Sequence, residues 1–151
     1  MYRLSKAKFA QDLSGRGAEL IGGRWNSKGV PLLYTANSRA LCVAEIAVHT
    51  PLGIVPSDYC LITLSIPDDS IAEVLPGELP TTWKALPYMQ DTQHVGNSFV
   101  KEGGALALKV PSAVVQGEHN YLLNPRHRNA SDIKMVHVEP LEFDGRLFGL
   151  K

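Results

Sequence analysis

The chain has 151 residues, with 15 basic and 15 acidic side chains and a formal net charge of zero. That length is typical of one domain, and a composition with 44% hydrophobic and 20% charged residues excludes a disordered or fibrous protein. The charge balance argues against attachment to nucleic acid or anionic lipid by bulk charge. The sequence shows neither a secretory signal nor a membrane-length apolar run, so we expect a cytoplasmic protein.

The first clear elements are a strand followed by a helix. Residues 30–35 are apolar and β-favouring, and Pro31 indicates an edge strand or the start of a strand. Residues 39–49 contain no Gly or Pro and are preceded by Asn37 and Ser38, either of which can cap a helix. Because this helix is apolar on nearly every side, we expect it to be buried.

The rest of the chain alternates between short elements. We expect a strand at 59–66, a loop with at most one short helix at 75–89, a helix at 92–102, and strands at 105–110 and 133–138. The residues between the last two strands are expected to form a polar loop. Together these elements predict a single compact α+β domain with a central β core flanked by helices.

Two glycine-rich segments near the N-terminus carry cationic side chains. Residues 14–17 contain Arg16, and residues 22–29 contain Arg24 and Lys28. Glycine allows close backbone approach to a ligand while the cations donate to phosphate, so a phosphate or pyrophosphate site is one interpretation. A surface loop with solvated charges is the other. The spacing matches neither a P-loop nor a dinucleotide fingerprint.

Glu45 is unusual because it shares a helical face with Leu41 and Val48. Burying an unpaired carboxylate is costly, so this position needs an explanation. A structural ion pair with Arg24 or Arg39 would provide one. A functional carboxylate at the floor of a cleft is the alternative.

Ser112 follows the predicted strand at 105–110, where side chains are commonly delivered into a site. It does not lie in a Gly-x-Ser-x-Gly turn, so a hydrolase triad is not expected. The histidines and cysteines lack zinc-ligand spacing, and we expect no metal site. Cys42 and Cys60 lie in apolar runs and are expected to be free thiols.

Several motifs, taken in order, resemble the RES-domain family, which is named for an arginine, a glutamate and a serine. They are Gly22–Asn26, Leu33–Ala36, Ala40–His49, Trp83, Gly96–Phe99, Val110–Ala113 and Asn120–His127. The similarity extends from about Arg3 to Phe148. Matched residue by residue, the family's arginine, glutamate and serine correspond to Arg24, Glu45 and Ser112, and Tyr34 corresponds to a tyrosine of the family's pocket.

The resemblance implies one RES domain over residues 1–151 with a fold similar to that of ADP-ribosyltransferases. It further implies a toxin of a type II toxin–antitoxin system that depletes NAD, with NAD as substrate and no other cofactor. The implied partner is an antitoxin with an Xre-like helix-turn-helix domain that blocks the active site. We expect neither direct DNA binding nor membrane attachment, and a pairing of toxin chains within the complex is left open.

The catalytic role implied for Glu45 is to stabilise positive charge on the ribose as the nicotinamide bond breaks. Nicotinamide departs as a neutral group, so no second carboxyl is required as a proton donor. Arg24 is expected to bind the pyrophosphate or adjacent ribose. Tyr34 is expected to contact substrate through its ring, and Ser112 either to contact substrate through its hydroxyl or to fix Glu45. Arg16 and Asn26 are further expected substrate contacts.

Three alternatives remain beside NAD hydrolysis or phosphorolysis. The same pocket could transfer ADP-ribose to a protein, and the sequence contains no motif that separates these acceptors. A non-enzymatic binding module would use Arg24, Glu45 and Ser112 as a buried polar network. An RNA-cleaving toxin is disfavoured by the zero net charge and the lack of a paired-histidine site.

Overall fold

The computed structural model describes residues 1–150, which form one seven-stranded sheet with α-helices packed around it. The strands are β1 (Tyr2–Lys6), β2 (Leu33–Ala36), β3 (Tyr59–Ser65), β4 (Ile71–Glu73), β5 (Ala107–Pro111), β6 (His119–Leu123) and β7 (Lys134–Leu141). The helices are α1 (Arg16–Ile21), α2 (Arg39–His49) and α3 (Gln90–Glu102). The expected α+β class with a central β core is confirmed.

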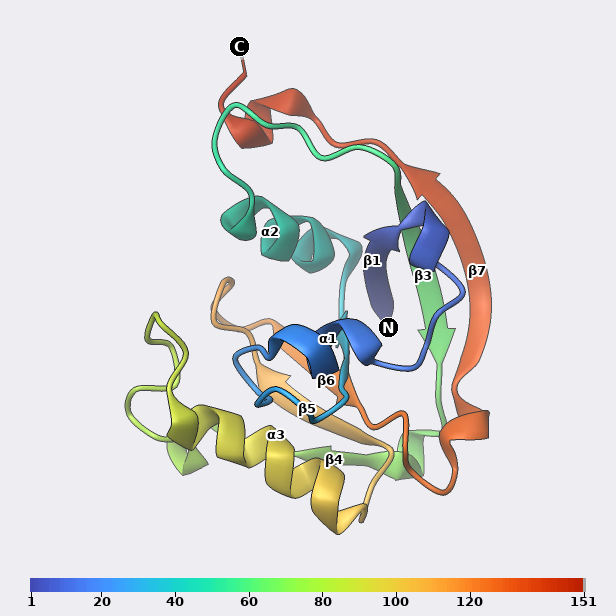
Figure 1. The fold of residues 1–151 in the computed structure, drawn as a ribbon, viewed down its shortest axis with the longest axis vertical. Helices are drawn as coiled ribbons and strands as arrows, with labels where there is room; N and C mark the ends of the chain where they lie inside the picture. Colours follow the sequence, from blue (N-terminus) through green and yellow to red (C-terminus); the bar gives the residue numbers. More distant parts are fainter. Residues whose placement is uncertain (151) are drawn as a thin grey trace.

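The sheet has the strand order β4-β5-β6-β2-β1-β3-β7 and consists of two halves. The strands β1, β3 and β7 form one half, and β4, β5, β6 and β2 form the other, with only β4 and β5 parallel. The halves are joined through the single register pair Tyr2 and Ala36. Figure 1 shows the two groups of strands running in different directions, with α2 beside β1 and α3 beside β4 and β5.

Two core clusters fix the helices α3 and α2 against the sheet. Trp25, Leu32 and Phe99 belong to the cluster beneath α3, together with inward-facing residues of β5 and β6. Leu41 and Cys42 belong to the cluster that fixes the first turns of α2 against the sheet. The helices α2 and α3 are therefore held on different halves of the sheet, and a pocket lies between α2 and the loops of the α3 half.

The predicted helix at 39–49 is confirmed as α2, with the Ser38 side chain accepting the Leu41 N–H at 3.1 Å. The expectation that this helix is buried was wrong. Only Leu41 and Cys42 are buried, and Val48 is 58% exposed. The physical reason is that α2 contacts the sheet mainly through its first turns, whereas its later turns border an open pocket.

The other predicted elements are present with shifted ends. The strand expected at 30–35 begins at Leu33, after Pro31, and lies inside the sheet between β6 and β1. The helix expected at 92–102 begins at Gln90, with Met89 as its N-cap. Sheet hydrogen bonds extend the last strand, expected at 133–138, to 134–141.

Four elements were missed. The segment predicted to be a polar loop contains β6, which pairs with both β2 and β5. The short strands β1 and β4 and the helix α1 carried no clear pattern. Strands this short are stabilised by their partners, so their own residues give little signal. Within the described part of the chain, no helix combines the length and apolar character needed to cross a bilayer.

Candidate active site

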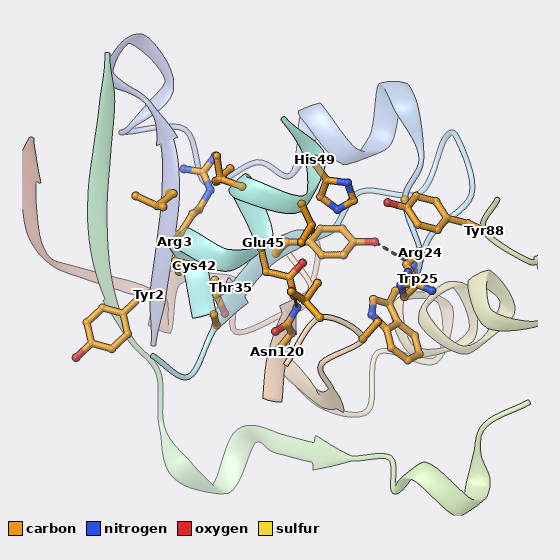
Figure 2. Close-up of a pocket in the computed structure, with 18 of the residues that line it drawn as sticks. Tyr2, Arg3, Arg24, Trp25, Thr35, Cys42, Glu45, His49, Tyr88 and Asn120 are labelled. Atoms are coloured by element: carbon orange, nitrogen blue, oxygen red, sulfur yellow. Dashed lines mark hydrogen bonds between the residues drawn. The ribbon is translucent and has the colours of Figure 1, made fainter. Parts of the chain in front are cut away.

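A pocket of about 570 Å³ lies between α2 and the loops of the α3 half of the molecule. Its walls come from β1, β2, α2, the loop before α3 and the segment after β5. Figure 2 shows Glu45, Arg24, His49, Tyr88 and Asn120 gathered around it. Most of the lining surface is apolar, and its charged residues are Glu45 and the cations Arg3, Arg24 and Lys84. Next to apolar surface, electrostatic interactions are stronger than in bulk water.

The carboxylate of Glu45 is held through one oxygen only. Its Oε1 accepts from Asn120 Nδ2 at 2.8 Å and from Ser112 Oγ at 3.4 Å. Its Oε2 has no hydrogen-bond partner among residues 1–150. The structural ion pair considered for Glu45 is not formed in this part of the chain, since Arg39 instead contacts Glu139 at 2.8 Å. Glu45 therefore presents a free oxygen beside the pocket.

Ser112 does not line the pocket, and its hydroxyl donates to Glu45. It is 2% exposed, and its Oγ accepts the backbone N–H groups of Val114 and Val115, each at 3.1 Å. These two bonds use both acceptor positions of the hydroxyl. The remaining hydroxyl proton is directed to Glu45, so of the two roles expected for Ser112 the geometry favours fixing the carboxylate.

Arg24 is held by the loop that precedes α3. Its Nη1 donates to the carbonyl oxygens of Trp83 at 2.6 Å and Ala85 at 3.2 Å. The ring of Tyr88 lies 5.0 Å from the guanidinium carbon. The other N–H groups of Arg24 have no partner among residues 1–150, so a preoriented cation remains able to donate to an anion in the pocket.

The loop that carries Arg24 is fastened to α3. Gln93 Nε2 donates to the carbonyl of Gly23 at 2.9 Å, and Asn97 Oδ1 accepts the N–H of Ser27 at 3.0 Å. Gly96 faces Trp25 so closely that an added Cβ would lie 1.9 Å from its carbonyl oxygen. The glycine at 96 thus permits the helix–loop contact that positions Arg24.

Tyr34 contributes its ring to the pocket, while its hydroxyl is used by the protein. The hydroxyl donates to Asn26 Oδ1 at 2.7 Å and accepts the Trp25 N–H at 3.1 Å. Burial raises the pKa of Tyr34 far above its usual value, so the hydroxyl stays protonated. This group is not available for acid–base chemistry on a ligand.

Two residues expected to bind substrate, Asn26 and Arg16, do not line this pocket. Asn26 is completely buried, and its amide donates to the carbonyls of Ala18 and Val30 at 2.9 and 2.8 Å. Arg16 is exposed on α1 and borders a separate hollow of about 350 Å³ with Arg126. The Asn26 side chain is directed inward, where it bonds carbonyl groups of α1 and of its own loop, and Arg16 lies on α1, none of whose residues line the pocket.

Most of the other pocket residues were not identified as site residues from the sequence, among them Cys42, His49, Tyr88 and Asn120. Asn120 is 9% exposed and begins the motif Asn120–His127, but no role in the site was assigned to it from the sequence. Burial, with a smaller contribution from the charge of Glu45, raises the pKa of Cys42 to about 12. Its thiol is therefore inert at neutral pH.

The fold is also found in a solved toxin–antitoxin assembly. A chain in the crystal structure of the M. tuberculosis MbcT-MbcA toxin-antitoxin complex aligns with a TM-score of 0.72 and 21% identity. The alignment covers 98% of this chain and 85% of that chain. At this identity the likeness establishes a common fold.

The family is established from the sequence. The RES domain model matches residues 1–144, and the chain belongs to the RES domain family. A "Prs ADP-ribosylating toxin" of Sphingobium sp. (strain YBL2) is 38% identical over 91% of this chain and 88% of its own length. Two proteins named "Toxin Res" are also similar. That of Yersinia enterocolitica is 35% identical over 95% of this chain and 94% of its own length. That of Pseudomonas putida is 39% identical over 91% of this chain and 93% of its own length.

Proposed function

We propose that this chain is the toxin of a toxin–antitoxin pair and that it cleaves the nicotinamide N-glycosidic bond of NAD. The observation that carries the proposal is Glu45, whose Oε2 is free beside an apolar pocket that also holds the oriented guanidinium of Arg24. The names of the relatives agree with a toxin role, and one of them is named for ADP-ribosylation.

The reaction needs a group that stabilises a cation, and the pocket offers one. When the bond between the ribose anomeric carbon and the ring nitrogen breaks, the electron pair leaves with neutral nicotinamide and positive charge develops on the ribose. The Glu45 carboxylate stabilises that charge in a medium of low polarity. Water or phosphate then supplies the new oxygen on the anomeric carbon and, in hydrolysis, releases a proton.

Substrate binding is assigned to two groups in this scheme. Arg24 binds the pyrophosphate through its unpaired N–H groups. The ring of Tyr34 packs against the nicotinamide or ribose. Both groups are fixed before a ligand arrives, Arg24 by the carbonyls of Trp83 and Ala85 and Tyr34 by Asn26.

The partner we propose is a cognate antitoxin with an Xre-like helix-turn-helix domain that covers the pocket in the cytoplasm. The solved structure with the same fold comes from a complex of a toxin and an antitoxin, which supports such a partner. In this arrangement DNA binding belongs to the antitoxin, in keeping with the zero net charge of this chain.

A second candidate is transfer of ADP-ribose to a protein. It is favoured by the 38% identical relative named an ADP-ribosylating toxin. The same Glu45 and Arg24 would act, and only the acceptor that reaches the anomeric carbon would differ.

The test uses purified protein free of antitoxin, mixed with NAD in buffers with and without phosphate, and follows nicotinamide and ADP-ribose products. Glu45→Gln should lower nicotinamide release about 10²–10³-fold. Glu73→Gln is the matched control, because Glu73 pairs with Lys109 on the sheet edge away from the pocket. Nicotinamide release that persists in Glu45→Gln would contradict the mechanism.

The acceptor is identified in the same experiment. Phosphate-dependent release indicates phosphorolysis, and release without phosphate indicates hydrolysis. Labelled NAD incubated with a cell lysate distinguishes protein transfer, which places the label on protein. A folded protein that neither releases nicotinamide nor labels protein would instead be a binding module.

A further inference from the structure

Asn120 occupies a position in the sheet where an apolar residue is the usual choice. It lies on β6, between Ala36 of β2 and Val110 of β5 in the strand register, and is 9% exposed. Asparagine is depleted in strands, and burying its amide is unfavourable without full hydrogen bonding. The sheet itself therefore gives no reason for asparagine at this position.

The side-chain amide is only half satisfied. Its Nδ2 donates to Glu45 Oε1 at 2.8 Å, whereas its Oδ1 is buried without a hydrogen-bond partner among residues 1–150. An unpaired buried acceptor lowers stability, and leucine of similar size would avoid that loss. A residue that lowers the stability of the fold at the wall of a pocket is typically retained because function requires it.

The contact with Glu45 is directional. The carboxylate can only accept, so the N–H group of Asn120, and not its oxygen, must face Glu45. A bond of 2.8 Å to an ionised acceptor is of the strong, charge-assisted kind, and the Ser112 bond to the same oxygen is longer at 3.4 Å. Figure 2 shows the Asn120 and Glu45 side chains directed toward one another at the pocket.

We infer that Asn120 is a positioning residue for Glu45, which fixes Oε1 within the protein so that Oε2 is the oxygen presented to substrate. The inference rests on the proposed function, because it assigns the reaction to the carboxylate of Glu45. Ser112 supports the same oxygen from the opposite end of the β5–β6 connection. Without Asn120 the carboxylate can rotate, and its free oxygen no longer has a fixed direction.

The first test is Asn120→Leu, assayed for kcat and KM on NAD and for thermal unfolding. We expect kcat to fall about 100-fold, the size of loss that misplacing a reacting group by 1 Å can cause. We expect little change in KM and only a small change in the unfolding midpoint, because removing the orphaned oxygen offsets the loss of the bond to Glu45. A purely structural residue would show the reverse, a lower midpoint with normal kcat per folded molecule, and that result would overturn the inference.

Asn124→Ala is the matched control. Asn124 is also buried, directly after β6, but its Nδ2 donates to the carbonyl of Val100, and it makes no hydrogen bond to Glu45. We expect a lower unfolding midpoint with kcat unchanged for the folded fraction. If Asn120→Leu does not fold, Asn120→Ser replaces it, because serine is too short to reach Glu45 and keeps a polar group in the sheet.

A double-mutant comparison shows whether Asn120 acts through Glu45. In a Glu45→Ala background, Asn120→Leu should cause no further loss of turnover and no change in the Kd for NAD, because the group that it positions is absent. A full additional loss of turnover, or a weaker Kd, would mean that Asn120 contacts substrate and would overturn the positioning role.

Failure of the proposed function has a different outcome. If the folded wild-type protein consumes no NAD, the proposed function fails, and the contact is then tested by unfolding alone. Changes in the unfolding midpoint for Asn120→Leu, Glu45→Ala and the double variant should be non-additive if the two side chains interact. Additive changes would overturn the inference independently of any activity.

Discussion

The hydroxyl of Tyr34 lies 2.7 Å from Oδ1 of Asn26 and donates a hydrogen bond to it. Tyr34 is on a central strand, whereas Asn26 is in the loop that carries Arg24, so this bond ties the loop to the sheet. The loop passes so close that a Cβ on Gly23 would lie 2.7 Å from the hydroxyl. The tyrosine hydroxyl thus serves the position of Arg24.

Tyr34→Phe tests this assignment. It leaves the Asn26 oxygen and the Trp25 N–H without their partner, so the free energy of unfolding should fall by about 1–3 kcal/mol. The ring remains in the pocket, and kcat measured for the folded fraction should be close to that of the wild type. Denaturant unfolding and nicotinamide release provide the two measurements. A large loss of kcat with normal stability would show that the hydroxyl takes part in the chemistry.

Arg24→Lys should weaken NAD binding. Lysine keeps the charge but loses the planar guanidinium, whose Nη1 bonds two carbonyls beside the Tyr88 ring and whose other N–H groups stay unpaired within the described chain and can donate to an anion. Loss of one charge-assisted bond should raise KM about tenfold. Because the pyrophosphate is equally charged in substrate and transition state, kcat should change less. Arg146→Lys, at an exposed arginine paired with Asp144, is the control that should leave KM unchanged. An unaltered KM in Arg24→Lys would exclude the binding role.

Gly96→Ala should disrupt the contact between α3 and the loop of Arg24. The added Cβ would meet the backbone carbonyl of Trp25 at 1.9 Å, so helix and loop must separate. Overpacking of this kind costs about 1–3 kcal/mol of stability, and displacement of the loop should also lower activity. Gly104→Ala is the control, because an added Cβ there meets nothing within 4 Å. Equal unfolding midpoints for the two variants would contradict the proposed packing role.

Stability should decline at alkaline pH through Cys42. Burial, with a contribution from the charge of Glu45, raises its pKa from 9.0 to about 12 in the folded protein. The thiol therefore adds stability that is fully present below pH 9 and is lost as the pH rises through 12, because the unfolded chain ionises first. Unfolding free energy measured at increasing pH above 9 should fall less steeply in Cys42→Ala than in the wild type. Equal slopes would contradict the shifted pKa.

The sequence by itself was informative wherever short-range interactions decide the outcome. The bounds of α2 and its Ser38 cap follow from local propensity and local hydrogen bonds. Membership of the RES family was likewise recognisable from ordered motifs such as that around Arg24, and the family model confirms it. Glu45 was singled out because a carboxylate on an apolar helical face is visible in the sequence alone.

Only the tertiary structure decided which side chains meet. Asn120 and Glu45 are 75 positions apart, and β6, which carries Asn120, was predicted to be loop. A strand of this length is defined by hydrogen bonds to distant partners, which no local pattern reports. For the same reason the sequence could not show that Asn26 turns inward while Arg16 lies at a separate hollow. Local chemistry selected the candidate residues, and long-range strand pairing determined which of them share one pocket.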